Sequence, residues 1–161
     1  MNAASRSAFA ALALSLALSL TSPPSFAQES RFVGSWVLDA VKSKAPVAPG
    51  TATIVISDLG GGKYKSVSDT TVAGQTAHSE ITFAIDGKDY VAQTTPAMPA
   101  GMQVMQSFEK AGDGYKNTLK VSGQLVATTV AEVSAEGKTL TLTTTAAIDP
   151  ATSTLLVLTR K

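Results

Sequence analysis

The stretch Glu136-Gly137-Lys138-Thr139-Leu140-Thr141-Leu142-Thr143-Thr144-Thr145 decides the fold class of this chain. Its Glu-Gly pair predicts a turn, because glycine readily adopts the positive φ that tight hairpins require. After the turn, Leu140 and Leu142 alternate with threonines. Side chains along a strand point to opposite faces in turn, so the alternation predicts a β-strand with one buried and one solvated face.

Two further segments repeat this alternation. In Ser79–Ile85 the large apolar residues Ile81, Phe83 and Ile85 share one face of the predicted strand. In Tyr115–Val121 a tyrosine, a leucine and a valine stand opposite two lysines and a threonine. Such alternation is typical of antiparallel strands with one face on the core.

Two other segments, Gln124–Val133 and Leu155–Leu158, are more uniformly apolar. A strand that is buried on both faces has this kind of sequence. We therefore expect both segments to be covered on both faces.

Turn signals recur along the chain, at Gly60-Gly61-Gly62, Ala73-Gly74, Asp86-Gly87, Gly112-Asp113-Gly114, Ser122-Gly123, Glu136-Gly137 and Asp149-Pro150. The runs between them predict ten strands, at residues 34–41, 52–58, 63–71, 76–85, 88–93, 103–110, 114–122, 125–133, 138–146 and 154–160. Hairpin-linked strands leave two edges unless the sheet closes. The sequence thus predicts an all-β protein with little helix, an antiparallel up-and-down barrel of about eight to ten strands. A β-sandwich is the alternative.

Composition narrows the possible functions. The chain has 161 residues and a formal net charge of +1, which gives no electrostatic attraction to nucleic acid. It has no cysteine and one histidine, which excludes disulfides, thiolate metal sites and multi-histidine metal sites within one subunit. It has nineteen threonines after residue 27, and β-branched residues favour strands.

Residues 1–27 have the three-part layout of a signal peptide. Arg6 is the one charged residue, an apolar run from Ala8 to Leu20 follows, and Ser25-Phe26-Ala27 supplies small residues for cleavage. Thirteen helical residues span about 20 Å, which is too short for the roughly 30 Å core of a bilayer. The sequence predicts cleavage after Ala27, one mature domain at 28–161 without a membrane span, and a periplasmic or extracellular location.

The mature chain opens with Phe32-Val33-Gly34-Ser35-Trp36-Val37-Leu38. This segment resembles the first strand of lipocalin and fatty-acid-binding (calycin) barrels. The resemblance implies that Gly34 lets the chain bend into the barrel and that Trp36 plugs the closed end. It also implies a basic residue on the last strand above the tryptophan ring, here Arg160.

Small exported bacterial lipocalin-like proteins, largely uncharacterised, show a closer resemblance. The shared markers are Lys42-Ser43-Lys44, Asp86-Gly87-Lys88-Asp89-Tyr90 and the run from Ser134 to Thr141. The chain departs from typical relatives in having no C-terminal helix pattern. The 42–50 stretch, with Pro46 and Pro49, also cannot form the helical lid of a fatty-acid-binding protein.

These observations favour a non-catalytic barrel that binds a small apolar or amphipathic molecule without a cofactor. The large side chains expected around its cavity are Tyr64, Phe83, Tyr90, Met102, Met105, Phe108 and Tyr115. The stretch Thr94–Gly101 is the expected loop at the cavity mouth. One alternative is an envelope protein–protein interaction module with a filled barrel. A weaker alternative is Cu(I) binding by Met98, Met102 and Met105, because thioethers are soft ligands.

Catalytic and metal chemistry has little support. His78 and Glu80 share a strand face but lack a further ligand, which indicates a solvated face. The pairs Asp86/Asp89 and Glu132/Glu136 flank turns. We therefore expect no catalytic residue, no metal site and no enzyme activity.

Overall fold

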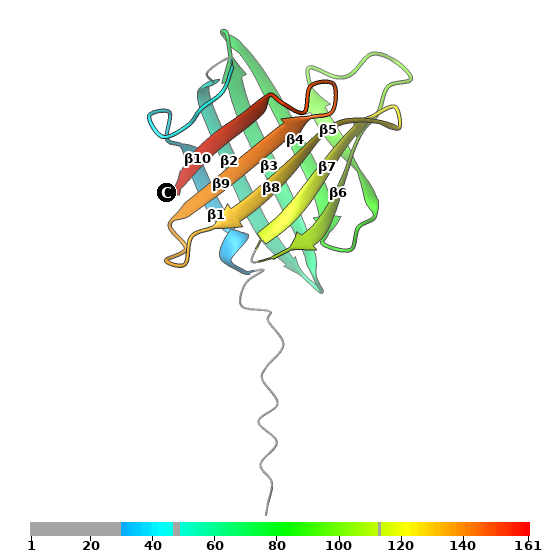
Figure 1. Cartoon of the computed structure of the whole chain (residues 1–161). Helices are drawn as coiled ribbons and strands as arrows, with labels where there is room; N and C mark the ends of the chain where they lie inside the picture. Colours follow the sequence, from blue (N-terminus) through cyan, green and yellow to red (C-terminus); the bar gives the residue numbers. More distant parts are fainter. Residues whose placement is uncertain (1–29, 47–48, 113) are drawn as a thin grey trace, which may run out of the picture.

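A computed structural model of the chain describes residues 30–46, 49–112 and 114–161. A short 3-10 turn, η1 (Ser30–Phe32), precedes ten β-strands (Figure 1). Their bounds are β1 (Gly34–Leu38), β2 (Pro49–Gly60), β3 (Lys63–Val72), β4 (Gln75–Ala84), β5 (Asp89–Thr95), β6 (Val104–Ala111), β7 (Gly114–Val121), β8 (Gln124–Val133), β9 (Thr139–Ala146) and β10 (Ser153–Arg160). All ten expected strands are present, with ends shifted by at most three residues.

The strands form a closed antiparallel barrel in which each strand pairs with the next, and β10 returns to pair with β1 (Figure 1). Trp36 on β1 lies opposite Arg160 on β10 at this seam. Closure leaves none of the ten described strands as an edge strand, which removes the main route to unwanted strand pairing. The barrel prediction is confirmed, and the sandwich alternative is wrong.

The register fixes which side chains enter the barrel. Leu142 on β9 lies between Ala131 on β8 and Leu156 on β10, and all three follow the inward phase of their strands. The threonines of β9 at 139, 141, 143 and 145 occupy the outward phase, as the alternation predicts. The inward sets of Ser79–Ile85 and Tyr115–Val121 are likewise the predicted ones.

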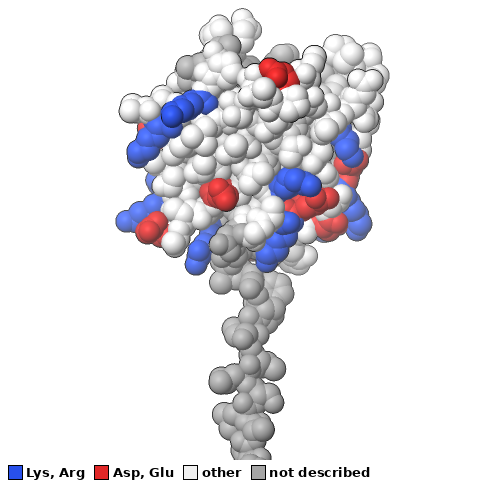
Figure 2. Space-filling model, in the orientation of Figure 1, with Lys and Arg blue, Asp and Glu red and all other residues white. Residues whose placement is uncertain are grey.

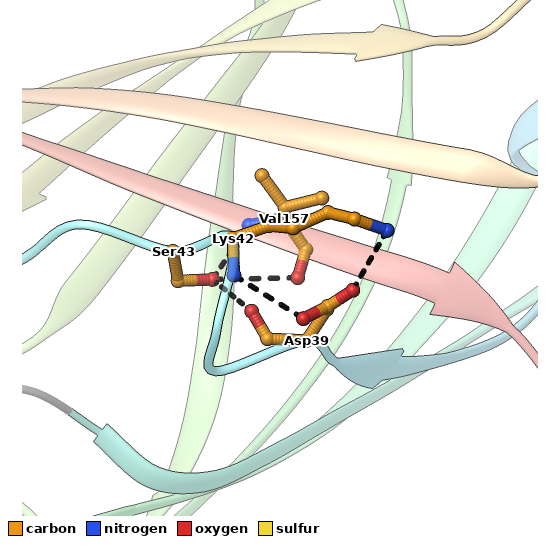
Figure 3. A network of polar contacts seen from close by, with 4 residues as sticks. All are labelled: Asp39, Lys42, Ser43 and Val157. Atoms are coloured by element: carbon orange, nitrogen blue, oxygen red, sulfur yellow. Dashed lines mark hydrogen bonds and ion pairs between the residues drawn. The ribbon is translucent and has the colours of Figure 1, made fainter.

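The segment between β1 and β2 differs from the prediction. The first strand ends at Leu38 rather than at residue 41, because a turn begins at Asp39 (Figure 3). Ser43 then returns the chain to β10: its hydroxyl accepts a hydrogen bond from the Val157 amide at 2.9 Å and donates to the Asp39 carbonyl at 2.8 Å. Lys44 pairs with Leu155 through two backbone hydrogen bonds of 2.7 Å. The segment thereby extends the seam beyond the end of β1.

The same turn is stabilised by an ion pair. The Lys42 ammonium lies 3.0 Å from the Asp39 carboxylate, and the Lys42 amide donates to the other carboxylate oxygen at 3.2 Å. The hydrogen bond from the Lys42 side chain is the main cause that lowers the pKa of Asp39.

The outer face of β8 corrects one expectation. Leu125, Val126 and Val130 are 52%, 41% and 37% exposed, so β8 is not covered on both faces. Val157 on β10 is buried, and the Asp39 amide and the Ser43 hydroxyl both bond to its backbone. The prediction that both faces are covered is therefore partly right for β10 and wrong for β8.

Charged side chains of both signs stand on the outside of the barrel, and few lie over the centre of the face in Figure 2. Several form cross-strand pairs, among them Lys65–Glu80 and Lys116–Glu109, both at 2.7 Å. Among the residues that the structure describes, no helix is long and apolar enough to cross a membrane. The predicted signal peptide, residues 1–27, lies outside the described residues.

Candidate functional site

The closed end of the barrel is filled by aromatic side chains. Phe83 and Phe108 stack with ring centroids 3.8 Å apart, and Phe32 from η1 meets Tyr115 edge-on at 4.7 Å. Trp36 is fully buried, and its indole N–H donates to the Phe32 carbonyl at 2.9 Å. The η1 turn thus plugs the end of the barrel from which β1 starts.

Arg160 seals this end from outside. Its guanidinium donates to the carbonyls of Val33, Arg31 and Gly137 at 2.6–2.7 Å and lies 4.4 Å from the centre of the Trp36 ring. The cation–π contact that the resemblance implies is therefore present. Gly34 has a φ of 146°, and a Cβ there would collide with the guanidinium. This close approach explains the glycine before the tryptophan.

A cavity of about 170 Å³ lies above this aromatic floor, within the barrel. Its apolar lining comes from Ile54, Ile81, Phe108, Leu142 and the ring of Tyr115. Its neutral polar lining is larger in number: Ser66, Ser68, Ser79, Gln106, Asn117, Thr129 and Thr144. Among the residues that the structure describes, none that lines the cavity is charged.

Some of these polar groups bond to one another. The Asn117 side-chain amide donates to the Gln106 side-chain oxygen at 3.1 Å, and the hydroxyls of Thr129 and Thr144 lie 2.8 Å apart. Tyr115 behaves differently. Burial alone raises the pKa of its phenol to about 12, so the group is neutral in the physiological range. The phenol has no hydrogen-bond partner within the part of the chain that the structure describes.

The structure places the seven predicted ligand-binding side chains in different environments. Phe108 and Tyr115 line the cavity. Tyr64 and Phe83 are buried in the aromatic floor, with ring centroids 5.8 Å apart. Tyr90 packs at the edge of the core, and its hydroxyl donates to Asp86 in the β4–β5 turn at 3.0 Å. Four of the seven thus belong to the cavity or to the floor beneath it.

The two methionines correct the prediction. Met105 pairs with Val91 and Lys120 on the outward phase of β6, so it does not line the cavity. Met102 lines a separate groove of about 230 Å³ beside the β5–β6 loop, together with Met98. The copper hypothesis needs the thioethers of Met98, Met102 and Met105. The groove brings the first two together, whereas Met105 is outside its lining. The loop after Thr95 borders this groove and not the main cavity.

Sequence reasoning missed the polar residues of the cavity, because it selected large side chains. Yet Ser66 and Ser68 alternate in phase with Tyr64, and Ser79 with Ile81. Extending each inward face beyond its last large residue finds them. That extension predicts polar side chains in the half of the barrel interior above the aromatic floor.

The other chemical candidates lie outside the cavity. His78 bonds Asp69 at 2.7 Å on the outer face, and Glu80 pairs with Lys65. Asp86 accepts from the Lys88 amide and pairs with the Lys88 ammonium at 3.0 Å, and the amide bond is the main cause that lowers its pKa. Asp89 pairs with Lys120 at 2.8 Å. Glu132 is on the outward phase of β8, and Glu136 is exposed in the β8–β9 turn.

The fold is shared with known structures. A mutant of the fluorescent protein UnaG matches with a TM-score of 0.59 and 17% identity, covering 83% of this chain and 98% of that one. Fatty-acid-binding protein 1 of Echinococcus granulosus matches with a TM-score of 0.57 and 18% identity, covering 81% and 98%. The Schistosoma mansoni fatty-acid-binding protein in complex with arachidonic acid also scores 0.57 at 18% identity, covering 82% and 97%.

The chain has a calycin-type barrel fold. No protein-family model matches it, and no curated protein sequence does so. At these identities the likeness concerns the fold.

Proposed function

We propose that this protein is an exported barrel that binds a small apolar or amphipathic molecule in its interior and does not catalyse a reaction. The cavity of about 170 Å³ above a solid aromatic floor is the observation that carries the proposal. Close packing leaves few voids larger than a water molecule in most proteins, so a space of this size within the barrel is unusual. The fatty-acid-binding proteins among the structural neighbours support the same kind of function.

The non-catalytic part rests on where reactive groups lie. The imidazole of His78 and the carboxylates of Asp69 and Glu80 are on the outer face, away from the cavity lining. The cavity offers hydroxyls and amides without a general base to activate them.

Native mass spectrometry of protein purified gently from its own host tests binding. We expect an adduct of small-molecule mass that is lost when the protein is unfolded and refolded. Bare protein in every gentle preparation would contradict the proposal. The same spectra test export: a chain beginning at Gln28 supports cleavage, and an intact chain starting at Met1 in the envelope fraction contradicts it.

The alternative, an interaction module, has one observation in its favour. Leu125, Val126 and Val130 expose aliphatic groups on the outer side of β8. Exposed apolar clusters can mark protein interfaces. Replacing all three by threonine separates the two functions: a partner-binding module loses its partner, and a small-molecule binder keeps its adduct.

A further inference from the structure

We propose that the cavity selects ligands whose polar group is uncharged, such as a carboxamide or a ketone, and discriminates against carboxylates. This inference rests on the proposed function and concerns the chemistry of the molecule that the same cavity binds. It depends on three observations: the absence of charge in the lining, the unused neutral hydrogen-bonding groups, and the size of the space.

The charge distribution is the first observation. Twelve of the described residues line the cavity, and none of these is Asp, Glu, Lys, Arg or His. A carboxylate that enters a desolvated site without a cation loses its hydration and gains no ion pair, which is strongly unfavourable. The cation at the closed end gives no help, because the Arg160 guanidinium lies on the outer side of Trp36 and is occupied by three backbone carbonyls and the Trp36 ring.

Several other charged side chains form ion pairs on the outside of the barrel. Lys65, Lys116 and Lys120 bind Glu80, Glu109 and Asp89 across the outer faces of neighbouring strands. Residues next to them on the same strands carry serine, asparagine and leucine side chains on the inward phase. The strands therefore place charge outside and neutral polarity inside.

Unused hydrogen-bonding groups are the second observation. Tyr115 is buried, with an exposed fraction of 8%, and it lines the cavity. Its hydroxyl has no hydrogen-bond partner within the described residues. No fully buried side-chain nitrogen or oxygen among the described residues lacks a partner, so the unpartnered phenol is accessible from the cavity. A ligand that accepts its proton therefore gains a hydrogen bond that no described residue provides. Its high pKa keeps the group a donor.

The amide pair next to Tyr115 adds a donor and an acceptor. Because Asn117 donates to the Gln106 oxygen, the Gln106 amide nitrogen can donate and the Asn117 oxygen can accept. The hydroxyls of Ser66, Ser68 and Ser79 also line the cavity, and no hydrogen bond joins them to other described residues. A neutral carboxamide, which both donates and accepts, matches this mixed set, whereas a carboxylate only accepts.

Size is the third observation. A cavity of about 150 Å³ accepts one benzene molecule, so the 170 Å³ here holds about one ring with a small substituent. Polar side chains line the space above the aromatic floor, so the polar group of a ligand whose ring rests on that floor lies among them. The lining therefore has to accommodate that group.

Three probes of one shape test the inference: benzamide, benzoate and toluene, titrated into the purified protein at about pH 7 and followed by the NMR shifts of cavity residues. We expect benzamide to bind at least about tenfold more tightly than benzoate, the cost of one uncompensated charge being larger than that of one lost hydrogen bond. Benzoate within threefold of benzamide, or binding more tightly, overturns the inference and leaves the proposed function standing. Binding of toluene alone does the same. If none of the three binds, the proposed function itself fails.

The Tyr115→Phe variant tests the role of the phenol, since it removes the hydroxyl and keeps the ring against Phe32. One neutral hydrogen bond corresponds to about a two- to tenfold change in affinity. We expect benzamide to bind that much more weakly and toluene to bind as before. Ser57→Ala, which removes a hydroxyl from the outer face of β2, is the matched control and should change neither affinity. Unchanged benzamide affinity in Tyr115→Phe overturns the assignment of the phenol to the ligand.

Discussion

The barrel interior has a closed half, filled by large aromatic side chains, and an upper half, where small polar side chains line the cavity. The same strands build both halves. On β3, Tyr64 fills the closed half and Ser68 lines the cavity above it. On β4, Phe83 lies in the closed half and Ser79 in the upper one. The backbone continues unchanged from one half to the other, so the difference lies entirely in the size and polarity of the inward residues.

This difference separates stability from binding. Burial of aromatic and aliphatic side chains is the main favourable term in folding, and the closed half holds most of it. The upper half gives up that contribution, because serine and threonine bury little apolar surface and leave space between them. A barrel that was filled along its whole length would be more stable and would bind nothing inside.

The Trp36→Ala substitution is the strongest way to break the closed half. It removes a fully buried ring, the hydrogen bond to the Phe32 carbonyl and the surface under Arg160. Such deletions cost about 3–5 kcal/mol, a large part of the stability of a domain this size. Urea unfolding followed by circular dichroism measures the loss. Thr143→Ala on the outer face of β9 is the control, and an equally small loss in both variants would contradict the assignment of stability to the closed half.

Alkaline pH lowers the stability of the folded protein through Tyr115, which lies where the closed half meets the cavity. Burial raises its pKa to about 12, above the ordinary value of 10.0, so the folded state disfavours the phenolate. The stabilising contribution is complete below about pH 10 and is lost as the pH rises toward 12. The loss of this contribution corresponds to about 2–3 kcal/mol.

The measurement is the free energy of unfolding against pH for the natural protein and for Tyr115→Phe. We expect the variant to lose less stability between about pH 10 and 12. Parallel curves would show that Tyr115 titrates as an ordinary solvent-exposed tyrosine. Such a result would place it outside the sealed floor.

Arg160→Ala tests the outer seal of the closed half. The guanidinium connects two backbone segments, through the carbonyls of Arg31 and Val33 in one and of Gly137 in the other, but it stands partly in solvent. Its hydrogen bonds are therefore worth about 1–2 kcal/mol together rather than their full buried value. Arg160→Lys should recover only part of the loss in thermal unfolding, because an ammonium cannot reproduce a planar fork of donors. Full recovery by lysine would mean that the positive charge near Trp36 provides the stability and that the hydrogen bonds to the three carbonyls do not.

The sequence predicts the fold better than the site because different features determine them. Alternation in Thr139–Thr145 and the regular turns specify strands and their faces, and hairpins of adjacent strands leave few topologies. The pairing of Trp36 with Arg160 also follows from the resemblance of the first strand. The early end of β1 was missed, since Ser43 replaces strand pairing by a hydroxyl bond that depends on a residue 114 positions away.

The cavity lining depends on register and on barrel closure, which no local pattern reveals. Met105 illustrates the problem: this large apolar residue, three positions before Phe108, is expected inside, but the odd spacing places it on the opposite face of the strand. The serines were overlooked for the converse reason. Their phase is readable, but their role becomes visible only when six strands bring neutral polar groups to one space.

Filling the upper half has the smallest expected effect on the free energy of unfolding, and it raises that free energy instead of lowering it. Ser79→Leu adds apolar atoms to a side chain that lines the cavity, where space is available. Cavity filling of this kind raises stability by about 0.5–2 kcal/mol, and we expect the lower end because a hydroxyl is lost. Ala131→Leu makes a comparable enlargement in the closed half, where the residue is fully buried against the core, and overpacking there lowers stability. Thermal unfolding of the two variants compares the halves directly, and binding of toluene should vanish in Ser79→Leu. If both leucines destabilise the protein equally, the upper half is packed as tightly as the lower one and the cavity is not available to a ligand.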